Sequence, residues 1–268
     1  MTKRTMEQLK KHFEIERELT KKLLESSRDK RKELYKTTYN ELFQKVPDHP
    51  SLTKNPEKIE RANVNKYKLV KKYVGKNKTF AEFGPGDCEF CYFLSNMFKK
   101  VYGLDILDQS ETEKGKPNNF VLIEYDGYNI DLPNKSIDIL FSHHVIEHIH
   151  PDDISLHFKL AKRILKDRAV YKFVIPHRYR GPSDISKYFS DIPQGLHLNE
   201  PIYTEIISIL KEFGFTKIYC YWLFGPIIFR LPKYFFMKIE YLFRNIKQKY
   251  RRPILRYLIP QIVISAKN

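Results

Sequence analysis

Three acidic residues of this sequence stand where short apolar runs end, and each has the chemistry to bind a cationic or hydroxylated ligand. Glu82 lies in the run 79–83, just before a Gly-Pro-Gly turn, and Asp105 and Asp126 follow the next two runs. Glycines allow a tight turn and a close approach of the backbone to a ligand. An acid that ends a second strand can accept two hydrogen bonds from a ribose diol, and one that ends a third can accept from an exocyclic amine.

The Gly-Pro-Gly turn does not complete the dinucleotide-binding fingerprint. The pattern GxGxxG requires a third glycine at position 89, where this chain has Glu89. The carboxylate of Glu82 would also repel a pyrophosphate, whereas it would attract a cation. The turn therefore predicts a cleft for a cationic ligand.

Histidines that follow predicted strands are candidates for a general base. His143 follows the run 137–141, and His177 follows the run 169–175. Imidazole suits proton removal because its unperturbed pKa lies near neutrality. A role limited to packing and hydrogen bonding is the alternative for each histidine, and His148 is interpreted as a support of its loop.

A long polar segment follows residue 175 and is punctuated by proline and glycine. Loops above a cleft at the end of a sheet commonly contact the substrate. The predicted acceptor-binding residues of this segment are Arg178, Asp184 and His197.

The segment His144-Val-Ile-Glu-His148 matches the H-x-x-E-H pattern of a class of metallopeptidases. That pattern needs both histidines on one face of a long helix and a third ligand from elsewhere. Here Pro151 limits the segment to a short turn. We expect no metal site; the alternative is a magnesium site near the methyl group, with Asp184 and Asp191 as the candidate carboxylates of the loop.

These residues need a scaffold that brings strand ends together, and the hydropathy pattern predicts one. Apolar runs alternate with amphipathic stretches of helical length, which indicates βαβ units and a mostly parallel sheet covered on both faces. Residues 6–45 have helical spacing, and three prolines in 46–58 mark a linker. The runs are 79–83, 100–104, 120–125, 137–141, 169–175, 216–223 and 261–265, and the helical stretches include 59–73, 90–98, 154–165 and 203–213.

The composition excludes several classes of protein. With 268 residues and 42% hydrophobic content, the chain can form a core and is not wholly disordered. Three cysteines exclude a disulfide scaffold and suit a reducing compartment. No secretory signal and no run of about 18 apolar residues is visible, so we expect a cytoplasmic protein.

The net charge of +16 is concentrated in two flanks. Residues 1–40 have a local charge of +5 and residues 227–260 one of +8. The segment 226–260 combines eight phenylalanines and tyrosines with nine basic residues, which suits an anionic membrane surface at the inner face. One alternative is that the aromatic side chains cover the edge of the sheet and the charges only face solvent. The other is that the segment binds nucleic acid, but no recognised nucleic-acid-binding motif supports it.

Four motifs of this chain resemble those of the class I S-adenosylmethionine-dependent methyltransferases. The matching stretches are Glu82-Phe-Gly-Pro-Gly, Gly103-Leu-Asp, Asp126-Gly and the segment 136–148, in the family's order and at its spacing. The resemblance covers roughly residues 67–215, with 261–267 as the last strand. Cys88 stands where the family pattern often has a third glycine.

The resemblance implies S-adenosyl-L-methionine as cofactor and a role for each matching residue. The residues around the glycine turn would surround the methionine portion. Asp105 would hold the ribose hydroxyls and Asp126 the adenine amino group, while Ser142 would lie beside the transferred methyl. The implied cofactor-binding residues are Glu82, Gly84, Pro85, Gly86, Asp105, Ile106, Asp126, Gly127, Ser142 and His143.

The predicted fold is an α/β, Rossmann-like, seven-stranded, mostly parallel sheet with helices on both faces. Its parts are a helical extension and linker (1–58), a core (59–225), a basic aromatic insertion (226–260) and a last core strand (261–268). A face of the extension formed by Tyr35, Tyr39 and Phe43 is predicted to close the cleft or to dock on the core.

The predicted function is O-methylation of a hydroxylated small molecule, such as a sugar or an intermediate of glycan biosynthesis, with a histidine as general base. An RNA methyltransferase and a non-catalytic module that binds S-adenosylmethionine are the alternatives. No oligomeric state is predicted.

Overall fold

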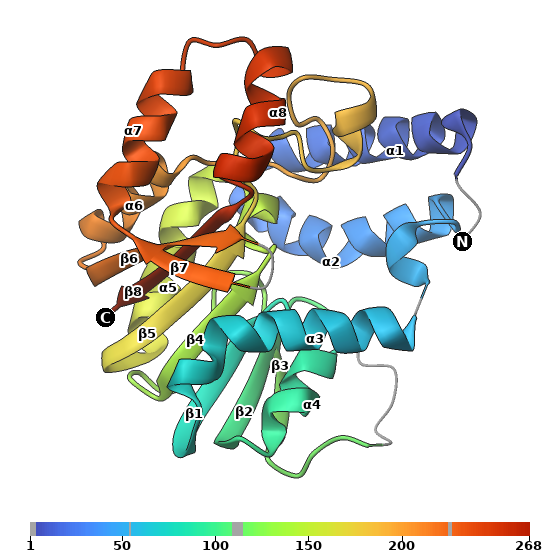
Figure 1. Ribbon diagram of the computed structural model, residues 1–268. Coiled ribbons are helices and arrows are strands. Elements are labelled where there is room, and N and C mark those ends of the chain that lie inside the picture. Colours follow the sequence, from blue (N-terminus) through green and yellow to red (C-terminus); the bar gives the residue numbers. More distant parts are fainter. Residues whose placement is uncertain (1–3, 54, 109–114, 225–226) are drawn as a thin grey trace.

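The computed structural model describes residues 4–53, 55–108, 115–224 and 227–268. Within these ranges the strands form one eight-stranded sheet, drawn in Figure 1. The strands are β1 (Gly75–Phe83), β2 (Phe98–Asp105), β3 (Phe120–Glu124), β4 (Ile137–His143), β5 (Leu165–Ile175), β6 (Thr216–Phe224), β7 (Ile227–Leu231) and β8 (Ile262–Lys267).

The helices lie before the sheet in the sequence, between its strands and in the basic insertion. They are α1 (Met6–Leu24), α2 (Arg28–Lys45), α3 (Pro56–Val70), α4 (Glu89–Ser95), α5 (Ile154–Ile164), α6 (Tyr203–Glu212), α7 (Lys233–Phe243) and α8 (Gln248–Leu258). Short 3-10 turns cover Pro50–Leu52, Lys71–Tyr73, Ile146–His148, Pro151–Asp153 and Ile185–Tyr188.

The sheet order is β3-β2-β1-β4-β5-β8-β6-β7, with β1 to β5 parallel and β8 antiparallel to both of its neighbours. The chain moves outward from β1 in one direction and returns to the other side through β4, so a topological switch point lies between β1 and β4. Ligands of open α/β sheets bind at this point, outside the carboxyl ends of the strands. The Rossmann-like α/β prediction is confirmed.

The predicted strand number of seven is wrong by one. The start of the basic insertion turns back as β7 and pairs antiparallel with β6 from Cys220–Leu231 to Phe224–Ile227. The side chains of β7 are exposed or half-buried. Because this edge strand has no buried face, it lacks the apolar–polar alternation by which a strand is recognised in a sequence.

Each face of the sheet packs against its own helices, because side chains along a strand alternate between the faces. Ala81 and Phe83 of β1 lie in the core formed with α5 and α6. Phe80 directly precedes Ala81 and therefore points to the other face, where it lies in the second core with residues of α3 and α4. This alternation decides which side chains at the strand ends can reach the cleft.

Helices α1 and α2 lie across the carboxyl ends of the strands (Figure 1). The sequence predicts continuous helical spacing over 6–45, but the structure divides this stretch between two helices. Ser27 caps α2, its hydroxyl accepting from the Lys30 amide, and Ser and Asp side chains favour such helix starts over helix interiors. Leu19, Leu23 and Leu42 pack the two helices against each other and against Leu196.

The basic insertion forms α7 and α8, which stand above β6 and β8 (Figure 1). Phe236 and Leu255 anchor the two helices in the core, while many other large side chains face outward. The exposed large hydrophobic residues of the insertion are Ile227, Phe229, Tyr234, Phe235, Tyr241, Leu242, Ile246, Tyr250, Ile254 and Tyr257. Among the described residues, no helix combines the length and the apolar content required to cross a membrane.

Candidate active site

The Gly-Pro-Gly turn leaves an open space at the end of β1. Gly84 and Gly86 have φ angles of +60° and +58°, which L side chains rarely adopt. A Cβ on Gly84 would come within 2.6 Å of Val145, whereas a Cβ on Gly86 would meet nothing within 4 Å. Cys88, in the family's glycine position, adopts φ +63° and thus keeps the left-handed turn.

A cavity of about 200 Å³ adjoins this turn, and we call it the glycine cavity. Its walls come from the ends of β1, β2 and β3, from the segment after β4, and from the N-terminal helices. The lining residues are Leu23, Tyr35, Thr38, Tyr39, Gly84, Gly86, Leu104, Asp105, Ile106, Tyr125, Gly127, Tyr128, His144, Val145, His148, Ile149, Asp153, His157 and Leu196. The structure therefore brings Gly84, Gly86, Asp105, Ile106 and Gly127 of the predicted cofactor set together around one cavity.

Asp105 supplies a buried carboxylate to this cavity. Its oxygens accept hydrogen bonds from the amides of Gly86 (3.2 Å) and Ile106 (2.7 Å). Burial raises the pKa of Asp105 to about 6, although these backbone hydrogen bonds act in the opposite direction. A carboxylate beside the open space at Gly86 fits a ligand that carries ribose hydroxyls.

Asp126 does not line the glycine cavity, although Gly127 does. Its carboxylate accepts hydrogen bonds from the amides of Tyr128 (2.9 Å) and Asn129 (2.7 Å) and so closes its own turn. Burial would raise the pKa of Asp126, but these hydrogen bonds and Lys32 hold it below its usual value. In this structure Asp126 shapes the loop that presents Gly127.

Glu82 and His143 point to the face of the sheet covered by α3 and α4. Glu82 is fully buried, with Lys66 of α3 at 3.2 Å and the Cys91 thiol of α4 at 3.3 Å. His143 lies beside Phe141 of the same face, and burial places its pKa well below the ordinary value. Neither side chain lines a cavity at the strand ends.

Ser142 points to the opposite face and is also fully buried. Its hydroxyl lies 2.9 Å from the hydroxyl of Tyr171, which in turn lies 2.8 Å from Nε2 of His157. Pro85, behind the turn, packs near Gly103 of β2. Of the predicted cofactor-binding residues, Ser142 and Pro85 thus support the site from within the core.

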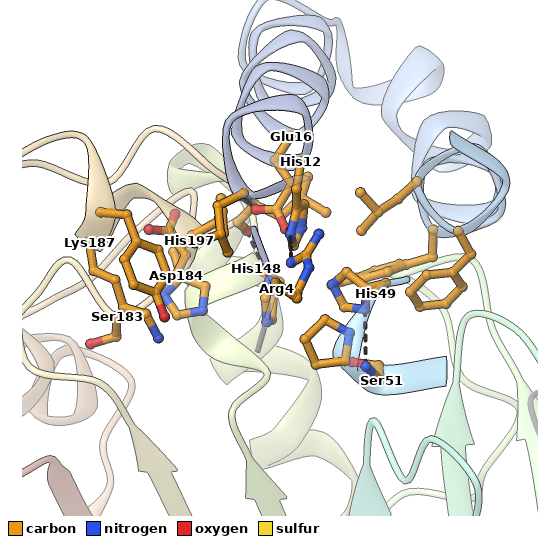
Figure 2. Close-up of a pocket in the computed structure, with 18 residues that line it drawn as sticks. Arg4, His12, Glu16, His49, Ser51, His148, Ser183, Asp184, Lys187 and His197 are labelled. Carbon is orange, nitrogen blue, oxygen red and sulfur yellow. Dashed lines mark hydrogen bonds and ion pairs between the residues drawn. The ribbon is translucent and has the colours of Figure 1, made fainter. Parts of the chain in front are cut away.

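A larger cavity of about 570 Å³ adjoins the glycine cavity, and we call it the histidine cavity (Figure 2). Tyr39, His148 and Leu196 line both cavities. The lining residues are Arg4, Leu9, His12, Glu16, Tyr39, Leu42, Phe43, His49, Pro50, Ser51, His148, Ser183, Asp184, Ile185, Lys187, Tyr188, Leu196 and His197. Two of the predicted acceptor residues, Asp184 and His197, are among them.

The imidazole of His148 stands at the boundary between the two cavities. Its Nδ1 lies 2.9 Å from the carbonyl oxygen of Leu196, which can only accept, so Nδ1 carries the proton. Burial lowers the pKa of His148, and the charge of His197 acts in the same direction. The neutral ring therefore keeps a lone pair on Nε2, which is the requirement for a general base.

His148 belongs to a cluster with Glu147 and His197. One ligand atom from each of the three side chains lies within 4.8 Å of the others. Glu147 is fully buried, and its Oε1 lies 2.8 Å from His144, whereas its Oε2 has no hydrogen-bond partner among the described residues. An orphaned buried carboxylate oxygen beside two imidazoles fits a proton or a divalent cation.

His197 is held by Glu200 and differs from His148 in its protonation. Its Nδ1 lies 2.7 Å from Oε1 of Glu200, and the two histidine rings are 5.0 Å apart in an edge-on arrangement. Burial would lower the pKa of His197, but the hydrogen bond to Glu200 and the charges of Glu147 and Asp184 raise it. The pair thus offers the histidine cavity one imidazole that stays neutral, His148, and one that is more readily protonated, His197.

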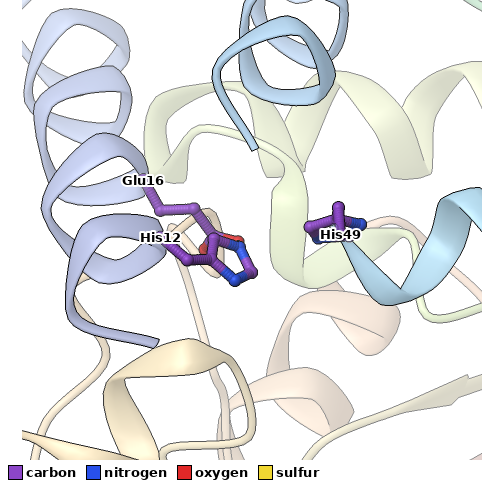
Figure 3. A group of neighbouring side chains, drawn as sticks. All are labelled: His12, Glu16 and His49. Atoms are coloured by element: carbon purple, nitrogen blue, oxygen red, sulfur yellow. The ribbon is translucent and has the colours of Figure 1, made fainter. Parts of the chain in front are cut away.

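A second cluster, of His12, Glu16 and His49, lines the far side of the histidine cavity (Figure 3). His12 already lies 2.6 Å from Glu16 and 2.8 Å from the guanidinium of Arg4. Glu16 also accepts from the amide of Leu196, and burial lowers the pKa of His49 to about 4. Because the groups satisfy one another and Arg4 would repel a cation, this cluster fits a metal less well than the cluster at Glu147.

The structure does not bring His177 to either cavity. The side chain is fully buried and lies 2.9 Å from Glu240 of α7, while its Nδ1 accepts from the Tyr179 amide. Arg178 makes two hydrogen bonds of 2.7 and 2.8 Å to the carboxylate of Glu205, so its guanidinium binds α6 and not an acceptor in this structure. Asp184 lines the histidine cavity but uses its oxygens to accept from the amides of Ser186 and Gly195.

The N-terminal helices cover the cleft rather than docking elsewhere on the core. Tyr35 and Tyr39 of α2 line the glycine cavity, and Tyr39 and Phe43 line the histidine cavity. The Tyr35 hydroxyl accepts from the amide of His150 at 2.9 Å, so α2 is fastened to the segment after β4. The predicted aromatic face thus closes both cavities.

The H-x-x-E-H segment forms the short 3-10 turn Ile146–His148, not a long helix. Its residues build the boundary of the two cavities instead of a peptidase zinc site. The sequence pattern pointed to these side chains, but not to the partner His197, which the fold brings in from a loop 49 residues further along the chain.

Comparison with known proteins agrees with the geometry. Residues 81–172 match a family model described as a methyltransferase domain. No curated protein matches the chain in sequence.

Solved structures share the fold at low identity. A S-adenosylmethionine-dependent methyltransferase from Archaeoglobus fulgidus aligns with 18% identity and a TM-score of 0.53, covering 78% of this chain and 94% of that one. One from Mesorhizobium loti aligns with 16% identity and a TM-score of 0.51, covering 76% and 98%. Phosphoethanolamine N-methyltransferase 1 from Haemonchus contortus aligns with 14% identity and a TM-score of 0.55, covering 88% of this chain and 49% of that one.

Three observations indicate a methyltransferase domain: the motifs at the strand ends, the glycine cavity and the match to the family model. The chain thus contains a region that matches a methyltransferase domain, and it shares the Rossmann-like fold of solved S-adenosylmethionine-dependent methyltransferases.

Proposed function

We propose that the protein methylates a hydroxyl group of a small hydroxylated acceptor, such as a sugar or glycan intermediate, with His148 as general base. The observation that carries this proposal is the position of His148 on the wall of both cavities. S-adenosylmethionine in the glycine cavity would supply a sulfonium methyl group. An acceptor in the histidine cavity would then meet that methyl group beside His148.

In this reaction the hydroxyl oxygen attacks the methyl carbon, the carbon–sulfur bond breaks, and its electron pair stays on the sulfur. The hydroxyl proton passes to Nε2 of neutral His148. The nearby carboxylate of Glu147, whose pKa is low because hydrogen bonding to His144 and neighbouring histidines outweigh burial, favours the imidazolium that forms. Alignment and proton removal are the two contributions that such a displacement needs.

His143 and His177, the bases expected from the sequence, are replaced by His148 in this proposal. Both rings lie outside the two cavities, and His177 is held by Glu240. A general base must come within hydrogen-bond reach of the proton it removes. Only a side chain on the cavity wall meets that condition without rearrangement of the core.

The lining of the histidine cavity supports a hydroxylated acceptor. It combines aromatic faces of Tyr39, Phe43 and Tyr188 with polar groups of Ser183 and His197. Aromatic faces pack against the apolar faces of a sugar ring, and the polar groups fix its hydroxyls.

Hydroxyl activation by a divalent cation is the second candidate, favoured by the orphaned Oε2 of Glu147. Glu147, His148 and His197 would hold the ion, and an acidic cation would lower the pKa of a hydroxyl near it. Treatment with EDTA separates the candidates. Activity that is lost and then restored by Mg²⁺ or Mn²⁺ favours the cation, and unchanged activity favours His148 as a base.

The basic insertion supports a position of the enzyme on an anionic membrane surface. Its exposed aromatic and aliphatic side chains accompany nine basic residues, and its one acid, Glu240, is buried. Aromatic side chains suit the headgroup level, and lysine and arginine suit anionic headgroups.

The test of the hydroxyl-methylation proposal measures methyl transfer from labelled S-adenosylmethionine into a polar small-molecule extract. The variant His148→Gln should lose roughly 10²–10⁴-fold in turnover but keep its affinity for S-adenosylhomocysteine. His143→Gln, a histidine outside both cavities, should stay within a few-fold of wild type. Wild-type turnover in His148→Gln would overturn the proposal.

A further inference from the structure

Four cationic side chains surround one small cavity that opens beside the histidine cavity. The cavity measures about 180 Å³, and Arg180, Lys187, Arg252 and Arg256 line it together with Pro182 and Ser183. No acidic residue is part of its lining. Ser183 and Lys187 also line the histidine cavity, so the two spaces adjoin.

These cations come from three separate parts of the chain. Arg180 follows β5, Lys187 lies in the 3-10 turn Ile185–Tyr188, and Arg252 and Arg256 lie on α8. The two residues on α8 are four apart and therefore lie on one face of the helix. The fold thus assembles a positive site that no single basic run of the sequence contains.

No direct ion pair within the described residues neutralises the positive charge of this site. Within the described residues, none of the four side chains forms an ion pair with a carboxylate, although many lysines and arginines elsewhere do. Burial lowers the pKa of Arg180, and the charges of Arg256 and Arg252 lower it further, outweighing the opposing charge of Glu200. Like charges held together in this way are disfavoured unless an anion binds between them.

We propose that Arg180, Lys187, Arg252 and Arg256 bind a phosphate or diphosphate group of the methyl acceptor. Guanidinium groups recognise phosphate oxygens through paired, charge-assisted hydrogen bonds, and Ser183 adds a hydroxyl. A phosphate ester held here would extend its hydroxylated part into the histidine cavity. The claim that this anion belongs to the acceptor rests on the proposed function, whereas anion binding itself does not.

Glu200 connects this site to the catalytic cluster. Its Oε1 accepts from the amide of Ser183 at 2.7 Å and lies 2.7 Å from the ring of His197. One buried carboxylate thus positions both the loop that carries the anion site and the imidazole of His197, which faces His148. This arrangement gives the phosphate a fixed position relative to the hydroxyl that is methylated.

The test measures binding of inorganic pyrophosphate by calorimetry at constant ionic strength. Wild type should bind one equivalent, and Arg252→Gln/Arg256→Gln should bind roughly tenfold or more weakly, since two charge-assisted contacts are lost. The control Lys247→Gln/Lys249→Gln removes the same charge from exposed positions near the start of α8 and should bind like wild type. Equal affinities in all three proteins would overturn the site, as would a loss of equal size in both variants.

Two competitors identify the source of the phosphate. Displacement of pyrophosphate by glucose 1-phosphate supports a soluble phosphate ester. Displacement by phosphatidylcholine vesicles that contain a polyprenyl phosphate, but not by vesicles without it, supports a lipid-borne ester. Displacement by neither overturns the assignment to the acceptor. S-adenosylhomocysteine should bind all variants equally, so failure of this site is distinguishable from failure of the proposed methyl transfer.

Discussion

Arg31 of α2 and Asp153 of the segment after β4 form a buried ion pair, with Nε 2.8 Å from Oδ2 and Nη2 3.2 Å from Oδ1. The Tyr128 hydroxyl donates to the same carboxylate at 2.7 Å. Since Tyr128 and Asp153 line the glycine cavity, this pair fastens the N-terminal cover directly to the wall of the cofactor site.

Replacement of Arg31 by Met should therefore weaken both the fold and cofactor binding. Removal of one partner leaves a buried charge uncompensated, which costs about 3 kcal/mol of unfolding free energy. Urea unfolding and calorimetry with S-adenosylhomocysteine measure the two effects. The control Lys30→Met removes only an exposed pair with Glu33 and should change stability by less than about 0.5 kcal/mol. Wild-type affinity and stability in Arg31→Met would contradict this role.

The pH dependence of cofactor affinity should report Asp105. The ionised carboxylate accepts hydrogen bonds from the ribose, and burial raises its pKa to about 6. Affinity for S-adenosylhomocysteine should be level above pH 6 and fall by about tenfold per pH unit below it, because binding must then release a proton. Asp105→Asn should bind more weakly with a flat profile between pH 4.5 and about 8. The same slope in Asp105→Asn would assign the titration to another group.

The cofactor-free protein should show the opposite trend in stability. A carboxyl group whose pKa is raised on folding binds more protons in the folded than in the unfolded state, in the window between its unfolded pKa of about 4 and its folded pKa. As far as Asp105 contributes, the unfolding free energy should rise as the pH falls through this window. Comparison of wild type with Asp105→Asn by urea unfolding isolates this contribution.

The strand pattern and the glycine turn were sufficient to predict most of the fold. Every predicted apolar run overlaps an observed strand, because period-two alternation and parallel burial leave a strong signal in the sequence. The face toward which a strand-end side chain points was not predictable. Glu82 and Ser142 lie at matching ends of β1 and β4, yet each points into a different core, which depends on the register of the sheet.

His148 is predicted to support its loop, and its hydrogen bond to Leu196 agrees with that role, but its place on the wall of both cavities was not predictable. Its sequence position was clear, but its orientation depends on a 3-10 turn and on a hydrogen bond to Leu196, 48 residues away. Likewise, the basic residues at 180, 252 and 256 meet only in the folded chain. Sites built from distant loops leave little local pattern in a sequence, whereas the glycine turn is local and was found.

His177 and Glu240 should matter for stability and not for methyl transfer. Glu240 accepts from His177 and from the amide and hydroxyl of Thr204 at the start of α6, and is buried. Glu240→Gln should cost about 2 kcal/mol of unfolding free energy, because charge-assisted hydrogen bonds are lost from a buried group. His177→Ala should destabilise the protein at least as much, because it removes a fully buried ring and leaves a cavity beside Glu240. Exposed Glu212→Gln is the control, and a loss of S-adenosylhomocysteine affinity in stable His177→Ala would contradict the structural role.

Association with membranes is tested by flotation with vesicles. Wild type should float with phosphatidylcholine vesicles that contain phosphatidylglycerol, and less so as the salt concentration rises, because headgroup attraction is screened. Tyr234→Ser/Tyr257→Ser removes two side chains that are 69% and 70% exposed and should reduce binding. Leu52→Ser, exposed outside the insertion, should not. No flotation of wild type at low salt would exclude this surface as a membrane contact.

The pH profile of turnover should follow the protonation of His148. The neutral ring is the active form, and burial holds its pKa below the ordinary value of 6.5. Turnover at saturating substrates should therefore be lost on acidification and be level at neutral pH. Glu147→Gln removes the neighbouring charge and should shift the acidic limb to lower pH, since the imidazolium loses its stabilising partner. An acidic limb that does not move would place the titration elsewhere.

The most direct test of the account identifies the atom that receives the methyl group. The enzyme is incubated with 13C-methyl S-adenosylmethionine and a polar small-molecule extract, and the products are characterised by NMR and mass spectrometry. The account predicts a methyl ether, formed by wild type and by His143→Gln but absent with His148→Gln. An N-methyl or C-methyl product, or a methyl ether formed equally well by His148→Gln, would contradict it.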